Sequence, residues 1–345
     1  MLMTKGGTMT RRLASIALAF MLAAGMVSCA PTGDTELWLA EPLSYDSALE
    51  EDSSSRTTDV TYVLRTITSD AEGGFWSHSS TSWLHIDRAG LTARRYNDFA
   101  SPSPSHIAAV SPTQLIAAVG PPFHTTPHAA GLYRVDTSTN RWSRMPVEST
   151  RVGAITVHDQ RIVYVDYTDE YPLSDDRAGM YTIRAVHADG TESVILGPDP
   201  SRLAADARLA TDASGLLWVA TESSTFTVSA DGAVEHIASN LGTNPVLAVS
   251  PAGSALVTAA TSVTTLDDGE WNLSGGSREA RSIVERSQGP PLVFIEPGGK
   301  AIALPFTANA IAAVWLDDTR FIAVIPGSGD EAVLLRVRIP QTATD

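Results

Sequence analysis

Cysteine is almost absent from this chain of 345 residues, because Cys29 is the only one. An intramolecular disulfide bond is therefore excluded, and stability must come from a large hydrophobic core. Long apolar segments are missing as well. The apolar run Leu13–Val27 has 15 residues, fewer than the roughly 20 that a membrane-spanning helix requires. The roughly 290 residues that follow the N-terminal region are enough for such a core.

Several motifs that carry chemistry are also missing. The sequence contains no Gly-x-Ser-x-Gly nucleophile turn, no phosphate-binding P-loop and no His-Glu-x-x-His zinc helix. The glycine pairs that begin at Gly73, Gly275 and Gly298 fit turns better than phosphate loops. These absences remove the commonest hydrolase, nucleotide-binding and metalloprotease predictions.

The N-terminal region has the composition of a secretory signal. Arg11 and Arg12 precede the apolar run, and the small residues Ser28-Cys29-Ala30 end it. The segment Met26–Cys29 resembles the lipobox of bacterial lipoproteins, with Met26 where leucine is usual. That resemblance implies cleavage before Cys29 and lipidation of its thiol.

Two alternatives remain open for this region: plain secretion, with cleavage after Ala30 and directly before Pro31, or an uncleaved anchor. We expect residues 1–28 to be a lipoprotein signal peptide. The membrane would then be a partner through the lipid on Cys29. The expected location is outside the cytoplasm, on the outer face of the bacterial cell membrane.

The chain is strongly acidic. Without residues 1–28 it has 21 basic and 39 acidic residues, a net charge of −18. Such a charge repels polyanions, so we expect no nucleic-acid partner. Residues 29–57 are acidic and poor in apolar residues, which predicts a disordered tether. Within them, the apolar Leu37-Trp38-Leu39 is expected to dock as an edge strand.

Residues 58–340 are predicted to be an all-β domain, because short β-branched and aromatic runs alternate with turn residues. The form Asp-x-x-Gly-x-x-Trp occurs at 70–76 and at 212–218. Second turns that contain Asp-Gly follow at 189–190, 231–232 and 268–269. Seven first turns recur at intervals near 40 residues: Ser69-Asp70, Ser111-Pro112, His158-Asp159, Thr211-Asp212, Ser250-Pro251, Ser287-Gln288 and Asp317-Asp318.

This period predicts a β-propeller of seven blades, each with four antiparallel strands. Six blades are the alternative, because the unit over 280–305 is thin. A β-sandwich is the competing fold. Either 37–40 or 60–64 is expected to complete the last blade, and Trp76, Trp218 and Trp315 are expected to pack between blades.

The segment Asp212–Thr221 resembles the repeats of sensor-type and NHL-like propellers, in which D-x-x-G-x-LWV-x-T opens the second strand. The resemblance covers this unit well and the unit at Asp70 in part. It implies the fold and transfers no functional residue. Propellers of this kind are mostly recognition modules, although lyases and lactonases also occur among them.

Two long loops are expected between the second and third strands of neighbouring blades, at 120–131 and 166–179. Such loops on a rigid scaffold often bind ligands. The first offers His124 and His128, and Tyr167 and Tyr171 in the second provide stacking surfaces. The second also carries carboxylates that suit calcium, unless they are only a solvated acidic surface: Asp166, Asp169, Glu170, Asp175 and Asp176.

We expect no cofactor, with calcium in that loop as the one alternative. The favoured function is a cell-envelope lipoprotein whose propeller binds or scaffolds a protein, glycan or peptide. The alternative is a propeller lyase or lactone hydrolase with a divalent metal at the channel mouth, and a third reading is a structural accessory subunit. Catalytic residues are not predicted, so an enzyme is the less favoured class.

Overall fold

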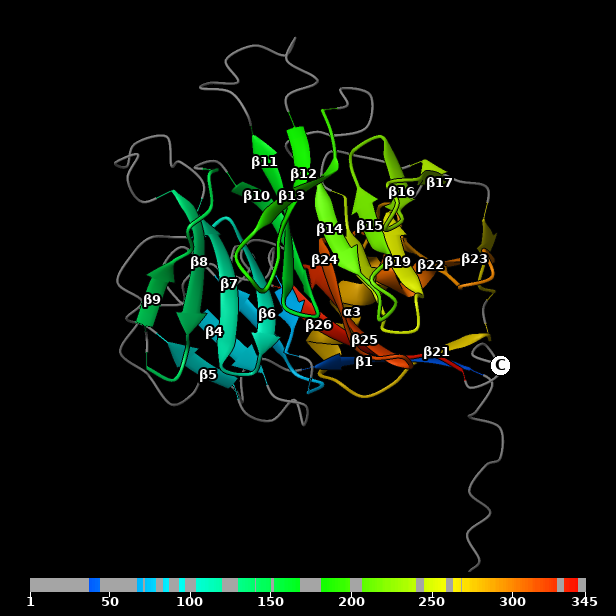
Figure 1. Cartoon of the computed structure of the whole chain (residues 1–345). Coiled ribbons are helices and arrows are strands. Elements are labelled where there is room, and N and C mark those ends of the chain that lie inside the picture. The colour runs from blue at the N-terminus through cyan, green and yellow to red at the C-terminus, as the bar shows by residue number, and fades with distance from the viewer. Residues whose placement is uncertain are drawn as a thin grey trace, which may run out of the picture.

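The computed structural model shows six sheets arranged in a ring, which is a six-bladed β-propeller (Figure 1). It describes residues 37–43, 67–70, 72–78, 83–86, 93–96, 104–119, 130–139, 141–149, 152–167, 181–198, 207–239, 245–258, 263–267, 269–327 and 332–340. The predicted β-propeller class is therefore confirmed.

Blades 1 to 4 are each formed by four consecutive antiparallel strands, A to D. Blade 1 consists of β2 (Ile67–Ser69), β3 (Phe75–His78), β4 (Trp83–Ile86) and β5 (Ala93–Tyr96). Blade 2 consists of β6 (His106–Ser111), β7 (Gln114–Val119), β8 (Gly131–Asp136) and β9 (Arg141–Arg144). Blade 3 consists of β10 (Val152–His158), β11 (Arg161–Tyr167), β12 (Tyr181–Val186) and β13 (Glu192–Leu196). Blade 4 consists of β14 (Arg208–Thr211), β15 (Leu217–Ala220), β16 (Ser224–Val228) and β17 (Val234–Ser239).

Blades 5 and 6 have five strands each because they share an insertion. Blade 5 consists of β18 (Leu247–Val249), β19 (Ala255–Thr258), β22 (Leu292–Ile295) and β23 (Ala301–Leu304), with β20 (Thr264–Thr265) parallel to β23. Blade 6 consists of β24 (Ala312–Asp317), β25 (Arg320–Pro326), β26 (Ala332–Arg338) and the N-terminal β1 (Trp38–Leu43). β21 (Trp271–Leu273) adds to it parallel to β1. A 3₁₀ turn, Pro305–Thr307, follows blade 5.

The prediction of seven blades is wrong, and the insertion explains the error. The supposed sixth unit over 280–305 contains the third and fourth strands of blade 5, preceded by helix α3 (Arg278–Arg286). Ser287, counted as a first turn, is the C-cap of that helix. Ser277 caps its N-terminus by accepting a hydrogen bond from the amide of Ala280 at 3.1 Å. The all-β prediction does not include this helix, which buries Ala280 and Val284.

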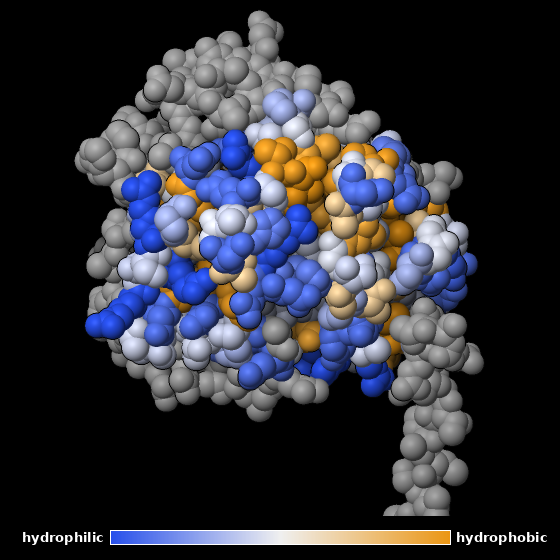
Figure 2. Space-filling view, viewed as in Figure 1, coloured by the Kyte–Doolittle hydropathy of each residue, from blue (hydrophilic) through white to orange (hydrophobic). Residues whose placement is uncertain are grey.

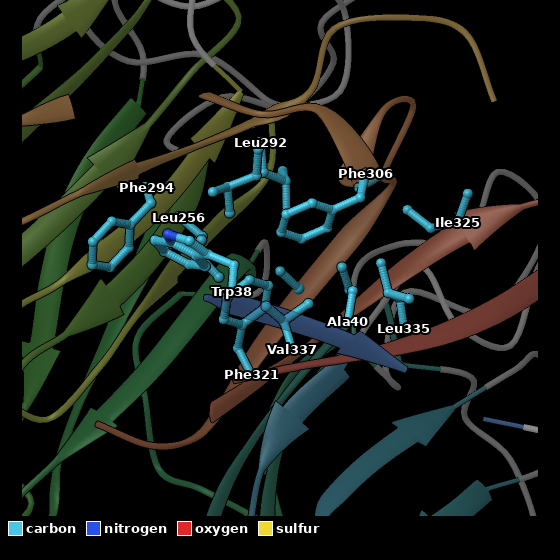
Figure 3. Packing of buried hydrophobic residues seen from close by; sticks show 14 of the residues in the cluster. Trp38, Ala40, Leu256, Leu292, Phe294, Phe306, Phe321, Ile325, Leu335 and Val337 are labelled. Atoms are coloured by element: carbon cyan, nitrogen blue, oxygen red, sulfur yellow. The ribbon is translucent and has the colours of Figure 1, made fainter. Parts of the chain in front are cut away.

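The ring closes through β1, as expected for the apolar Leu37–Leu39 segment. β1 pairs antiparallel with β26 and supplies the fourth strand of blade 6. Trp38 and Ala40 are buried in a cluster shared with blade 5 (Figure 3). The ring centroids of Trp38 and Phe294 are 5.2 Å apart in an edge-to-face arrangement. Part of the region predicted as a disordered tether is therefore a strand of the propeller. The rest of 29–57, and the signal segment 1–28, lie outside the described residues.

Six hydrophobic clusters hold neighbouring blades together. In β7, Leu115 and Ala117 face blade 1 while Ile116 and Ala118 face blade 3, because successive side chains of a strand point to opposite faces. Trp76, Trp218 and Trp315 pack between blades, as predicted. Each blade buries both of its faces only when the ring is complete.

The two Asp-x-x-Gly-x-x-Trp turns have a common geometry. Oδ1 of Asp70 accepts hydrogen bonds from the amides of Glu72 (2.9 Å) and Gly74 (2.8 Å). Oδ1 of Asp212 accepts the equivalent bonds from Ser214 (2.9 Å) and Leu216 (3.0 Å). The aspartate thus satisfies backbone donors that the tight turn leaves without partners.

Acid should weaken the turn at Asp70. Burial acts to raise the pKa of this carboxyl, but the hydrogen bonds to His85 (2.8 Å) and to the two amides outweigh it and hold the pKa below its usual value. The stabilisation from this lowered pKa is present above the ordinary value of about 3.9 and is lost as pH falls through the folded-state pKa.

We expect the difference in unfolding free energy between the wild type and Asp70→Asn to shrink between pH 6 and pH 3. Urea titrations across that range measure it, with Glu72→Gln as the control for charge removal. A constant difference would contradict the assignment.

Candidate functional site

The first strands of the six blades surround the central channel. β2, β6, β10, β14, β18 and β24 contact one another in that order, and β24 returns to β2. All six begin at the same end of the channel, on the face where B–C and D–A connections lie. We call this the mouth face, and the opposite side, with the A–B and C–D turns, the turn face.

A cavity of about 560 Å³, including the solvent at its opening, lies at the channel mouth. It is built from the beginning of every first strand. Apolar residues contribute from each blade, among them Ile67, Ile107, Ala154, Leu209, Val246 and Ala312, but more of the surface exposed to the cavity is polar than apolar. Two lining residues are basic, His106 and Arg208, and none of the described residues that line the cavity is acidic. The mouth therefore combines apolar residues from every blade with a polar surface that includes one arginine and one histidine.

His106 and Arg208 start two strands that are separated in the ring by β10. Nη1 of Arg208 lies 3.4 Å from Nε2 of His106 and 3.4 Å from the carbonyl oxygen of Ala207. Both distances are longer than the usual 2.9–3.0 Å of such hydrogen bonds. The small side chain of Ala154 on the intervening strand lines the same cavity. Both basic side chains are half-buried, while the neighbouring Ile107 and Leu209 are buried between blades.

The residues predicted at the rim are mostly not described. His124, His128, Asp169, Glu170, Tyr171, Asp175 and Asp176 lie outside the described residues. Tyr167 ends β11, and its side chain is not described either. The two loops do connect second to third strands of neighbouring blades, as expected, because they follow β7 and β11.

Asp166 is described, and it lies inside a buried polar cluster of blade 3. Its Oδ2 is 2.7 Å from Nε of Arg184, and it also accepts a hydrogen bond from the hydroxyl of Ser149. Arg184 is also 3.7 Å from Glu192, which accepts a hydrogen bond of 2.9 Å from the hydroxyl of Tyr164. Asp166 therefore has a cation of the protein itself beside it.

Burial, together with the hydrogen bond to Glu192, raises the pKa of the Tyr164 phenol above its ordinary value. The hydroxyl therefore stays protonated and donates to Glu192 at any physiological pH. The cluster of Tyr164, Asp166, Arg184 and Glu192 joins three strands of one blade, β11, β12 and β13. Its charges are paired within one blade, which is typical of a structural network, although Nε of Arg184 forms an ion pair with Asp166 without the geometry of a hydrogen bond.

Among the described residues, no group of three or more histidine, cysteine, aspartate or glutamate side chains is arranged to hold a metal ion. Within the same residues, no helix is long and apolar enough to cross a membrane. The large hydrophobic residues exposed in the described part are Val110 and Val194, on different blades. Figure 2 shows a mostly hydrophilic face, with hydrophobic surface gathered near β12, β13 and β14.

Sequence reasoning missed His106 and Arg208 because it searched the long loops. Both residues are single basic side chains at the start of a strand, without a motif around them. The signal that could have found them is positional: residues near the start of the first strand of each repeat line the channel mouth. Listing those positions across the repeat would have placed both residues at one opening.

No protein-family model matches the chain, and no curated protein is detectably similar to it in sequence. Solved structures are similar in fold. A protein of unknown function from Bacteroides thetaiotaomicron has a TM-score of 0.51 at 9% identity, covering 82% of this chain and 70% of that one. Regucalcin, a calcium-binding protein from Agrobacterium tumefaciens, has a TM-score of 0.50 at 12% identity, covering 79% of this chain and 90% of that one.

The fold is a β-propeller. A gluconolactonase from Xanthomonas campestris is also similar, with a TM-score of 0.49 at 14% identity, over 80% of this chain and 85% of that one. At such identities the likeness concerns the arrangement of blades alone. Functional residues of this propeller must therefore be argued from its own geometry.

Proposed function

We propose that this chain is a bacterial cell-envelope lipoprotein whose propeller binds another envelope component, a protein, glycan or peptide, at the channel mouth. The observation that carries the proposal is the cavity at the mouth face, to which all six blades contribute. Concave sites at which several structural elements meet are where proteins usually bind ligands. The lipobox-like segment at Cys29 supports the location.

The direction of β1 relates the proposed anchor to the mouth. Leu39 pairs with Arg338, at the end of β26 that lies on the turn face, and Leu43 pairs with Leu334 nearer the mouth face. β1 therefore enters the propeller from the turn face. A lipid on Cys29 would be joined to it by residues 30–37, which reach at most roughly 30 Å. Under this proposal the turn face lies next to the membrane, and the mouth face points away from it toward the partner.

Site-directed photo-cross-linking of the full chain in intact cells tests the binding face. A photoreactive benzoylphenylalanine replaces Ile311, a half-buried residue at the mouth, or Glu72, an exposed residue of a turn-face turn. We expect a specific adduct from position 311 and not from position 72. No adduct from 311, or equal adducts from both, would contradict a binding site at the mouth.

Replacing Cys29 by alanine in the same cells tests the anchor. We expect the variant to leave the membrane fraction, because a thioether-linked lipid needs the thiol. The unchanged chain, fractionated in parallel, is the control. A Cys29→Ala protein that stays with the membrane would show that lipidation is not the cause of attachment.

The alternative of a metal-dependent lyase or lactone hydrolase needs oxygen ligands that converge at the mouth. The described residues of the lining supply an arginine and a histidine instead. Regucalcin is described as calcium-binding, and it has a similar arrangement of blades. A calcium-dependent rise in melting temperature, reversed by chelator, would favour this second function.

A further inference from the structure

We propose that β9, the outermost strand of blade 2, is an interaction surface that binds an acidic, extended segment of a partner protein as a fifth strand. Three features carry the inference: an unpaired sheet edge, a group of arginines beside it, and the way in which this chain covers the same edge in two other blades. The inference goes beyond the proposed function, because it concerns the outer rim of the propeller and not the channel mouth.

The outer edge of β9 is open. Within the part of the chain that the structure describes, β9 pairs with β8 on one side and with no strand on the other. Its main-chain N–H and C=O groups on that side therefore have no described strand to bond to. Such an edge is a template for pairing with a further strand, from the same chain or from another one. The edge lies on the outside of the ring, where a partner can reach it (Figure 1).

The chain itself covers the equivalent edge of blades 5 and 6. β20 pairs in parallel with β23, the fourth strand of blade 5, and β21 pairs in parallel with β1, the fourth strand of blade 6. Main-chain hydrogen bonds hold β21 in place. The amide of Trp38 donates to the carbonyl oxygen of Glu270 at 3.0 Å. The amide of Ser274 donates to the carbonyl oxygen of Ala40 at 2.9 Å. A fifth, parallel strand is therefore compatible with the shape of these blades, and blade 2 offers the same position.

The charge of β8 and β9 selects what can occupy this edge. The two strands carry Arg134, Arg141 and Arg144, all exposed, and one carboxylate, that of Asp136. Figure 2 shows a strongly hydrophilic surface over this side of the molecule. The open fourth strands β13 and β17 differ, because each contains a glutamate and no arginine. In a chain with a net charge of −15, β9 is a local excess of positive charge, which is complementary to an acidic segment.

The arginines lie on both faces of the blade. Arg134 pairs with Ser143, which is two residues from Arg141, so these two arginines share one face. Arg144 is on the other face with Trp142, by the same alternation. The side chains of an added strand also alternate between the two faces. A segment with acidic residues at neighbouring positions would therefore meet arginines on both faces, whereas acidic residues at every second position would meet them on only one.

Fluorescence anisotropy with the labelled peptide TEVEEVET tests the site on the purified full chain, at about 50 mM salt to limit screening. The peptide has glutamates on both faces of an extended strand. Two comparison peptides separate charge from strand pairing. One has glutamine in place of every glutamate, and the other carries N-methyl groups on both valines, which remove an amide donor from each edge. We expect the acidic peptide to bind at least tenfold more tightly than either.

Variants of the protein locate the binding. We expect the triple variant Arg134→Gln, Arg141→Gln, Arg144→Gln to weaken binding about tenfold, because each exposed charge pair contributes up to a few-fold. The matched control removes the same charge from exposed positions of α3, through Arg278→Gln, Arg281→Gln and Arg286→Gln, and should bind as the wild type does. Hydrogen exchange of the unaltered protein should slow at residues 141–144 of β9 when the peptide is bound, and stay unchanged at residues 192–196 of β13.

Several results would overturn the inference. The acidic peptide may fail to bind, or the N-methylated peptide may bind equally well, which would show that charge alone attracts it. An equal loss of binding in the α3 variant would show that the edge of blade 2 is not the site. If the arginines only keep β9 from pairing with other molecules, the peptide will not bind and the triple variant of blade 2 will self-associate in sedimentation experiments. Hydrogen exchange uses the unaltered protein, so it decides the matter even if a variant fails to fold.

Discussion

Replacing Arg184 by methionine is expected to lower the free energy of unfolding by about 3–5 kcal/mol. The guanidinium lies between two carboxylates, 2.7 Å from Asp166 and 3.7 Å from Glu192. The side chains of Asp166 and Glu192 are only 7% and 13% exposed. Methionine keeps much of the volume of arginine, so the loss would come from two buried negative charges left without a cation.

The third acidic neighbour of Arg184 contributes little to this effect. Glu148 is 3.9 Å from the guanidinium, but its side chain is 85% exposed and water screens the pair. The phenol of Tyr164 and the amide of Glu148 still donate to Glu192 in the variant, but neutral hydrogen bonds do not replace a full charge. Most of the lost stability should therefore come from the unpaired charges of Asp166 and Glu192.

Urea unfolding monitored by tryptophan fluorescence measures the change, with Arg141→Met as the control for an exposed arginine. Adding Asp166→Asn and Glu192→Gln to Arg184→Met should recover part of the lost stability, because the repelling charges are then gone. A loss below about 1 kcal/mol, typical of an exposed ion pair, would refute the buried character of the cluster.

The same cluster shows which kind of site the sequence does not reveal. The sequence predicts Asp166 as one of several loop carboxylates, because acidic residues follow it along the chain. In the structure it lies in β11, and its cation belongs to the next strand. Local composition describes the neighbours of a residue in sequence, whereas an ion pair across a sheet depends on strand register.

The blade count failed for a related reason, while the blades themselves were predictable. Turn residues such as Asp70 and Asp212 act within a few residues, so their spacing located the repeats correctly. The insertion between β19 and β22 also contains turn residues, and there they connect short strands that pair in parallel at the edges of two blades. In sequence, the turns of the insertion resemble the turns of a blade. Only the long-range pairing of the strands distinguishes the insertion from a blade.

Replacing Trp38 by alanine is expected to cost about 3–5 kcal/mol, because it removes a large buried side chain from the seam that closes the ring. Trp38 is 3% exposed and belongs to the cluster between blades 5 and 6. Its ring centroid lies 5.2 Å from that of Phe294. Its backbone amide donates a hydrogen bond of 3.0 Å to the carbonyl oxygen of Glu270. The cavity would lie where the N-terminal strand meets both blades (Figure 3).

The kinetics should be asymmetric, since β1 and β26 lie near opposite ends of the sequence and their pairing closes a very long loop. Such contacts are expected to form late in folding, so Trp38→Ala should accelerate unfolding and leave the folding rate nearly unchanged. Stopped-flow urea chevrons measure both rates.

Trp38→Phe, which keeps an aromatic ring between blades 5 and 6, should lose much less stability. A folding rate that falls in proportion to the lost stability would show instead that ring closure belongs to the folding nucleus. In that case β1 would pair with β26 early in folding, and the remaining blades would assemble afterwards.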